Sequence, residues 1–182
     1  LGDGPPPGPG DDLGDAAILP GLVNAHTHLE LSWMAGRVPP SASMTEWILT
    51  LLRVRRAGPP DGDEGAARAA WEAAAAMRAA GTVLVGDVSN TLMSPRALVE
   101  AGLPGVVFHE VLGLNPADPA RQVQEAWERV ARAERALTEP ENPRTREPEN
   151  LSFSVVAHAP YSVAPSLFTE IARRAGSAPL SV

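Results

Sequence analysis

The chain contains no cysteine and no lysine, since all 15 of its basic residues are arginine. Without thiols it can form neither a disulfide framework nor a thiolate metal site, so a metal ion would be bound by His, Asp or Glu. No apolar run approaches the ~20 residues that cross a bilayer, and no signal peptide is visible. These absences predict a cytoplasmic protein with no membrane partner. The chain does not begin with Met, so an export signal before Leu1 stays an open alternative.

Positive charge is scarce as well. The formal net charge is −7 over 182 residues, and the arginines form no basic patch in the sequence. Nucleic acid is therefore not an expected partner, because its binding depends on clustered positive charge.

The most informative segment is residues 19–32, LPGLVNAHTHLELS, which places two histidines one residue apart at the end of an apolar stretch. Residues 22–25 predict a short buried strand after a Pro-Gly turn. Side chains at i and i+2 of a strand leave the same face, about 6–7 Å apart. His26 and His28 can therefore converge on one ion, at about 2.0–2.1 Å if it is zinc. The alternative interpretation is a pair of ordinary histidines that are satisfied at the surface or in the core.

Strands and helices alternate along the rest of the chain. Ser43 with Glu46 predicts a capped helix start, and Ser94 is expected to be an N-cap followed by proline at the first helical position. Long apolar strands that alternate with helices predict an α/β fold with a parallel sheet covered on both faces. The expected strands are 82–88, 105–112, 151–157 and the opening of another at 180–182. The expected helices are one after the Ser43 cap that the stretch 58–62 ends, and those at 63–80, 94–101, 118–137 and 165–175, with a solvated loop at 138–150.

Two segments carry a resemblance to a known family. Residues 19–32 resemble the first-strand signature of the metal-dependent amidohydrolase superfamily, Pro-Gly-x-x-(Asn/Asp)-x-His-x-His. The part NAHTHLELS at 24–32 is similar to the branch of cytosine deaminase-like, nucleoside deaminase-like and chlorohydrolase-like enzymes. Residues 156–165, VAHAPYSVAP, resemble the His-Ala-Pro-Tyr-Ser segment after the fourth strand of that branch. The two segments stand in the expected order, about 130 residues apart, and the likeness runs from about Asp12 onward.

The resemblance and the length together imply part of a barrel. A complete (β/α)₈ TIM barrel needs about 250 residues, whereas this chain supplies about four strand–helix units and the start of a fifth strand. We therefore expect the first half of such a barrel over residues 16–182. The family also carries a small β-sandwich built from both chain ends. Residues 1–15, rich in Gly, Pro and Asp, are expected to be an irregular lead-in that holds at most its trailing edge.

The resemblance implies that His26 and His28 bind one divalent ion, zinc in preference to iron or manganese. Binuclear members bridge two metals with a carboxylated lysine after the fourth strand, where this lysine-free chain has His158. The family completes its site with His-x-x-Glu on strand five, His on strand six and Asp on strand eight. The general acid/base Glu is therefore expected after Val182, and the 182 residues alone are expected to be inactive.

Four further residues are candidates for substrate binding. The resemblance implies that His158 contacts substrate instead of metal, with a hydrogen bond to a loop carbonyl as the alternative. Glu110 ends a strand and would meet a substrate amine or ribose, or else anchor a loop. Glu30 follows His28 by two residues and is expected to face the mouth of the barrel. Tyr161 would line the pocket, although packing explains it nearly as well.

Other polar residues are expected to be structural. Asp87 is expected to cap backbone groups, and His109 lies on the opposite face of the strand that carries Glu110. The arginines at 53, 55 and 56 are expected to form a solvated helix face.

Residues and resemblance together predict a metal-dependent hydrolase of non-peptide carbon–nitrogen bonds. The expected reaction is deamination of a purine-like or other N-heterocycle by metal-activated water. The alternatives are a chlorohydrolase or amide hydrolase of similar rings, and a metal-binding or scaffold fragment without catalysis. A phosphoesterase fits the Pro-Gly and His-Ala-Pro-Tyr segments poorly. The expected partners are the small-molecule heterocycle and a second copy, in a homodimer of the full-length enzyme.

Overall fold

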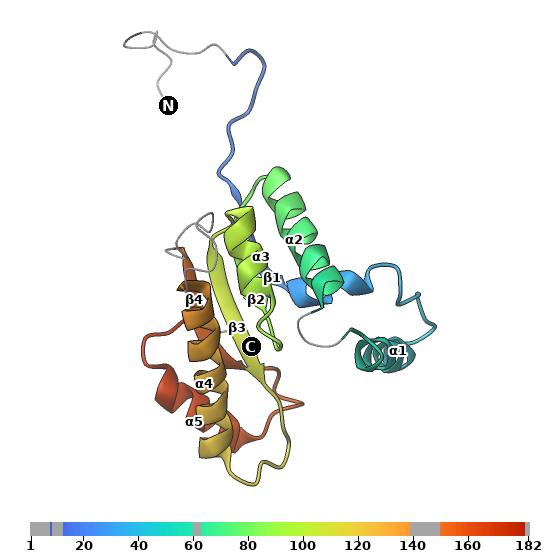
Figure 1. Cartoon of the computed structure of the whole chain (residues 1–182), viewed down its shortest axis with the longest axis vertical. Coiled ribbons are helices and arrows are strands. Elements are labelled where there is room, and N and C mark those ends of the chain that lie inside the picture. The colour runs from blue at the N-terminus through green and yellow to red at the C-terminus, as the bar shows by residue number, and fades with distance from the viewer. Residues whose placement is uncertain (1–7, 9–12, 60–62, 139–149, 181–182) are drawn as a thin grey trace.

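The computed structural model describes residue 8 and residues 13–59, 63–138 and 150–180. Within these ranges the chain forms one four-stranded parallel sheet in the order β1-β2-β3-β4 (Figure 1). Each strand is joined to the next by a segment that contains at least one helix, as parallel pairing requires. The strands are β1 (Leu22–Thr27), β2 (Thr82–Val88), β3 (Gly105–Val111) and β4 (Leu151–Ala157).

Every helix that the sequence predicts is present, and the α/β class is confirmed. The one helical element without a sequence prediction is a short 3₁₀ helix, η1, directly after the His-x-His segment. The helical elements are η1 (Leu29–Met34), α1 (Met44–Arg56), α2 (Glu64–Ala79), α3 (Ser94–Ala101), α4 (Pro119–Thr138) and α5 (Pro165–Ala175).

Local capping explains the start of α1 but not the start of α3. Ser43 Oγ accepts a hydrogen bond from the Glu46 amide at 3.2 Å, which confirms the predicted cap of α1. The prediction that Ser94 caps α3 is wrong, because Met93 occupies the N-cap. The Ser94 hydroxyl instead donates to the buried Asp87 carboxylate. The Ser94 hydroxyl therefore hydrogen-bonds a side chain of β2 and not the backbone at the start of its own helix.

The main core lies between one face of the sheet and helices α2 to α5. It joins apolar side chains of β2, β3 and β4 to the small and branched residues of those helices. The opposite sheet face carries a smaller cluster made of strand residues alone, namely Val88, Phe108 and Val156 with Val106 packed against them. In the described residues the helices therefore cover one sheet face, and the prediction that they cover both is wrong.

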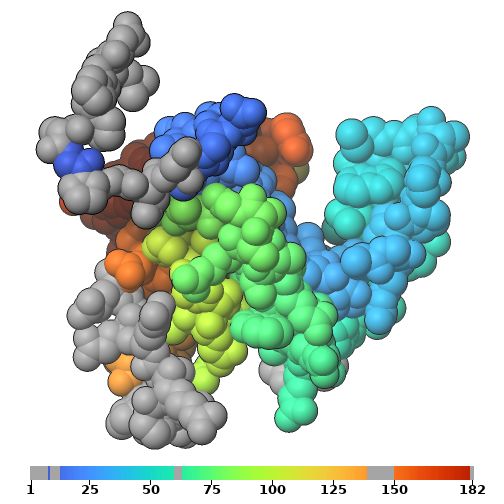
Figure 2. Space-filling model, turned by 90° about the horizontal axis from the view of Figure 1, so that it is seen from above, coloured from blue at the N-terminus to red at the C-terminus, as the bar shows by residue number. Residues whose placement is uncertain are grey.

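Strand β1 is an exposed edge strand. The sequence predicts that it is buried, but Leu22 is 59% and Val23 60% exposed. In the described part of the chain β1 pairs only with β2, on one side. Helix α1, which follows it along the chain, has no buried residue and stands apart from the sheet (Figure 2). Nothing in the described ranges covers the apolar side chains of β1.

The chain ends add little described structure. Residues 13–15 form no helix or strand, and most of the lead-in predicted at 1–15 lies outside the described ranges. Leu180 is not in a strand, and the rest of the strand predicted at 180–182 is not described. The predicted loop at 138–150 also lies almost wholly outside the described ranges. Among the described helices none is long and apolar enough to span a bilayer.

Candidate active site at the carboxyl edge of the sheet

The two histidines of the His-x-His segment face each other at the end of β1. Their Nε2 atoms are 3.2 Å apart, and the ring planes are inclined by 70°. Two nitrogens that each lie 2.0–2.1 Å from a tetrahedral ion would be about 3.3–3.4 Å apart. The spacing of His26 and His28 thus fits two ligands of one metal ion. Among the described residues no third His, Asp or Glu completes a metal-binding group.

The electrostatics of His28 suit a metal ligand. Burial lowers the pKa of its imidazole below the usual value, and the nearby Glu110 carboxylate partly opposes this shift. A lowered pKa keeps the ring neutral, with a lone pair available, at physiological pH. The structure thereby brings Glu110 into the electrostatic surroundings of the histidine pair. Glu110 is half-buried, and its Oε2 lies 3.5 Å from Asn90 Nδ2.

Glu30, in η1, is buried, with 3% of its surface exposed. Its Oε2 accepts hydrogen bonds from the Thr91 amide and hydroxyl, each at 2.8 Å, and from the Ser89 hydroxyl at 3.2 Å. Its Oε1 pairs with the Arg55 guanidinium at 3.0 Å. Both carboxylate oxygens are therefore engaged by the protein, and Glu30 ties η1 to the loop after β2 and to the last turn of α1.

Arg55 departs from the predicted solvated face. Arg53 and Arg56 are exposed as expected, but the Arg55 side chain is only 38% exposed and its guanidinium reaches inward to Glu30. The polar loop Ser89-Asn90-Thr91 was also missed by the sequence reasoning. Its position directly after a buried strand is the signal that could have revealed it, because barrel enzymes place functional loops there.

Asp87 has the capping role that the sequence predicts. Its Oδ1 accepts from the Leu29 amide at 2.9 Å, and its Oδ2 accepts from the Ser94 hydroxyl. Burial raises the pKa of this carboxyl to about 6, although the two hydrogen bonds act in the opposite direction. The carboxylate thus joins η1, which follows the two histidines, to the start of α3.

His109 is buried on the face opposite Glu110, and its Nδ1 lies 3.0 Å from the Ser89 carbonyl oxygen. Burial also lowers the pKa of this ring. This contact agrees with the structural role that strand alternation predicts, because it ties the His109 ring to the loop after β2.

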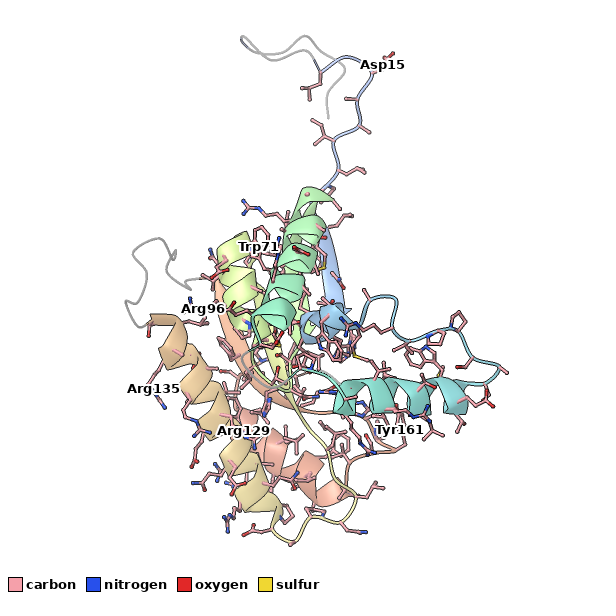
Figure 3. The ribbon with its side chains drawn as sticks, turned by 45° about the vertical axis from the view of Figure 1, so that its right-hand side comes forward. Asp15, Trp71, Arg96, Arg129, Arg135 and Tyr161 are labelled. Atoms are coloured by element: carbon pink, nitrogen blue, oxygen red, sulfur yellow. The ribbon has the colours of Figure 1, made fainter. Side chains whose placement is uncertain are left out.

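His158 follows β4 at the same carboxyl edge of the sheet. Its Nδ1 lies 2.7 Å from Ser162 Oγ, and its ring meets Tyr161 edge-on with centroids 6.1 Å apart. Tyr161 itself is 80% exposed and projects from the loop that begins α5 (Figure 3). The candidate residues therefore lie at or just after the carboxyl ends of the strands. The histidine pair lies at the end of β1 and His158 directly after β4, at opposite sides of the described four-stranded sheet.

Two curated relatives match most of the chain, whereas no family profile matches it. An aminodeoxyfutalosine deaminase from Nitratiruptor sp. is 25% identical over 149 residues, which is 82% of this chain and 33% of the relative. A 5-methylthioadenosine/S-adenosylhomocysteine deaminase from Nitratidesulfovibrio vulgaris is 29% identical over 167 residues, covering 86% of the chain and 33% of the relative. The chain thus spans about a third of the length of the curated relatives it matches.

Solved structures agree in fold. Helicobacter pylori aminofutalosine deaminase in complex with methylthio-coformycin matches with a TM-score of 0.63 and 27% identity, over 86% of this chain and 34% of that one. A triazine hydrolase from Arthrobacter aurescens matches with a TM-score of 0.62 over 87% of this chain and 38% of that one. At 18% identity the second match shows the fold alone. The parallel sheet corresponds to the first half of a TIM barrel, and the chain is similar to the N-terminal part of deaminases of the metal-dependent amidohydrolase superfamily.

Proposed function

We propose that the protein containing this chain is a metal-dependent hydrolase that deaminates an N-heterocyclic substrate. The observation that carries the proposal is the convergence of His26 and His28, whose Nε2 atoms are 3.2 Å apart at the carboxyl edge of the sheet. The two curated relatives support deamination over other hydrolyses, because both are named as deaminases. Expulsion of chloride or cleavage of an amide on a similar ring stays an outcome of the test.

The ligand chemistry favours one zinc ion held by His26 and His28, because imidazole is a common zinc ligand. Iron, which imidazole also suits, and manganese are the alternatives. When bound, such an ion supplies Lewis-acid activation of water near neutral pH. His28 contributes a neutral ring, since burial lowers its pKa. The Asp87 carboxylate holds the Leu29 amide directly after the pair and so limits how the two ligands can move.

The carboxylate of Glu110 and the imidazole of His158 supply polar contacts for the substrate in this proposal. Tyr161 is exposed enough to meet the substrate as well. Glu30 acts through the loops that it anchors, because both of its oxygens are occupied.

No histidine in this sequence begins a His-x-x-Glu motif, so the general acid/base is assigned to a residue outside these 182. The proposal includes a cytoplasmic location, a small-molecule partner and a homodimer of the intact enzyme, with the net charge of −7 speaking against nucleic acid.

Metal content and ammonia release test this function in the intact protein. We expect about one equivalent of metal per chain, since a mononuclear site holds one ion, and ammonia release from adenosine-type nucleosides. His26→Ala and His28→Ala should each lose both the metal and the activity. Thr27→Ala is the matched control, because this residue lies between the two ligands and strand alternation turns it to the other face.

Two outcomes would contradict the proposal. Two equivalents of metal per chain would exclude the mononuclear site. Retention of metal and activity in the double variant would show that the histidine pair is an ordinary structural feature of β1.

A further inference from the structure

A short chain of hydrogen bonds holds the ring of His158. Its Nδ1 lies 2.7 Å from Ser162 Oγ, and the same hydroxyl reaches the Ala159 carbonyl oxygen at 3.1 Å as a donor. His158 and Ser162 are both half-buried. In the described part of the chain no protein group engages His158 Nε2. One side of the ring is therefore held by the protein, and the other nitrogen is free for a ligand.

The backbone around Ser162 is clamped at several points. The Ser162 amide donates to Ala159 O at 3.0 Å, and its carbonyl accepts from the Gly113 amide at 3.0 Å. The His158 amide donates to Val111 O at 3.2 Å, so the same loop is joined to the end of β3 twice. These bonds fix where the hydroxyl of Ser162 meets the imidazole of His158.

The direction in which the Ser162 hydroxyl donates its one proton is linked to the tautomer of His158, and its contact with Ala159 O is the one in which it acts as a donor. A serine hydroxyl has one proton to donate and two lone pairs to accept with. When the proton goes to Ala159 O, the hydroxyl can only accept from the ring, so Nδ1 of His158 must carry the ring proton. In a neutral imidazole the other nitrogen, Nε2, is then an acceptor.

We propose that Ser162 is a positioning residue that holds His158 as the Nδ1–H tautomer, so that Nε2 accepts a hydrogen bond from an N–H or O–H group of the substrate. The part about substrate rests on the proposed function, whereas the tautomer does not. The edge-on contact with Tyr161 helps to orient the same ring, with the two ring planes at 88°.

This assignment narrows the substrate class. Glu110, whose carboxylate also accepts hydrogen bonds, lies near the carboxyl end of β3, opposite Val156 of the strand that His158 follows. A site that offers two acceptors favours a ligand rich in donors, such as a heterocycle with an amino group and attached sugar hydroxyls. An analogue that presents only acceptors there would leave the acceptors of His158 and Glu110 without partners, which costs binding free energy.

Histidine-selective ¹⁵N labelling of the intact protein tests the tautomer directly. At about pH 8, above the ordinary histidine pKa, we expect the correlation pattern of a proton on Nδ1 of His158. Ser162→Ala should shift the ring toward the Nε2–H form, and Ser162→Thr should keep the wild-type pattern because it retains the hydroxyl. Ser166→Ala, an exposed serine on α5, is the matched control and should change nothing.

Kinetics give the second measurement. Ser162→Ala should raise KM for a nucleoside substrate about tenfold, the loss expected for one hydrogen bond of about 1.4 kcal/mol, with a smaller change in kcat. Ser162→Thr should restore KM. A proton on Nε2 in the wild-type protein, or an unchanged tautomer in Ser162→Ala, would overturn the proposal. If the tautomer is as expected but no heterocycle releases ammonia, the proposed function fails while the role of Ser162 stands.

Discussion

At the scale of single residues, the titration of Asp87 makes the stability of the folded protein depend on pH. It is fully buried, and burial raises the pKa of its carboxyl from 3.8 to about 6. The folded state therefore favours the protonated acid more than the unfolded chain does. This contribution to stability is fully present below pH 4 and is lost as the pH rises through 6. At neutral pH the buried charge costs about 3 kcal/mol, at about 1.4 kcal/mol for each unit of pKa shift.

Asp87→Asn should remove this titration. The amide oxygen can still accept from the Leu29 amide, and the amide nitrogen can donate to the Ser94 hydroxyl. We expect the free energy of unfolding, measured by denaturant melts, to fall less between pH 4 and 7 in the variant than in the wild type. An identical pH dependence in both proteins would show that Asp87 does not titrate in this range.

At the scale of elements, one ion pair attaches helix α1 to the body. The helix has no buried residue, and the Arg55 guanidinium reaches the Glu30 carboxylate at 3.0 Å near its C-terminal end. Removing the cation leaves a buried carboxylate with only neutral donors, which is the costly way to break such a pair. Because Arg55 is partly exposed, we discount that cost to about 1–2 kcal/mol.

Arg55→Gln should therefore loosen α1 without unfolding the sheet. Hydrogen exchange should quicken across Met44–Arg56 and stay unchanged in β3 and β4. Arg56→Gln provides the control, because this arginine is exposed on the same turn. Equal exchange rates in α1 of the Arg55 variant and the wild type would mean that other contacts hold the helix.

At the scale of the whole molecule, the sheet has two edges and an apolar surface that the described residues leave open. Strand β1 exposes Leu22 and Val23, and its neighbour β2 exposes Val83 (52%) and Leu84 (42%). A closed barrel has no such edges, and exposed edges pair with other chains. A protein made of these 182 residues alone should therefore associate, melt without a sharp transition and release no ammonia.

Light scattering, thermal melts and an ammonia assay on that chain test the expectation. Val23→Lys should reduce association, because a charged residue on an exposed edge strand opposes pairing. A monodisperse monomer that melts cooperatively and deaminates a heterocycle would show that both the half-barrel and the missing acid/base are misassigned.

The sequence by itself determined the features that depend on short spacing. Strand alternation placed His26 and His28 on one face, and the order of strands and helices follows from apolar runs, prolines and glycines. It also anticipated Asp87 as a backbone cap. Each of these inferences needs only residues close in the chain, or the known geometry of one element.

Only the tertiary structure decided which partners distant residues meet. Ser94 donates to Asp87 instead of capping its helix, and Arg55 reaches Glu30 across 25 positions. In β1 the apolar side chains of Leu22 and Val23 lie exposed. A hydroxyl, a guanidinium or an apolar strand has the same local preferences in many folds. Which partner each of these groups contacts depends on how elements far apart in sequence pack together, and the local sequence pattern does not determine that packing.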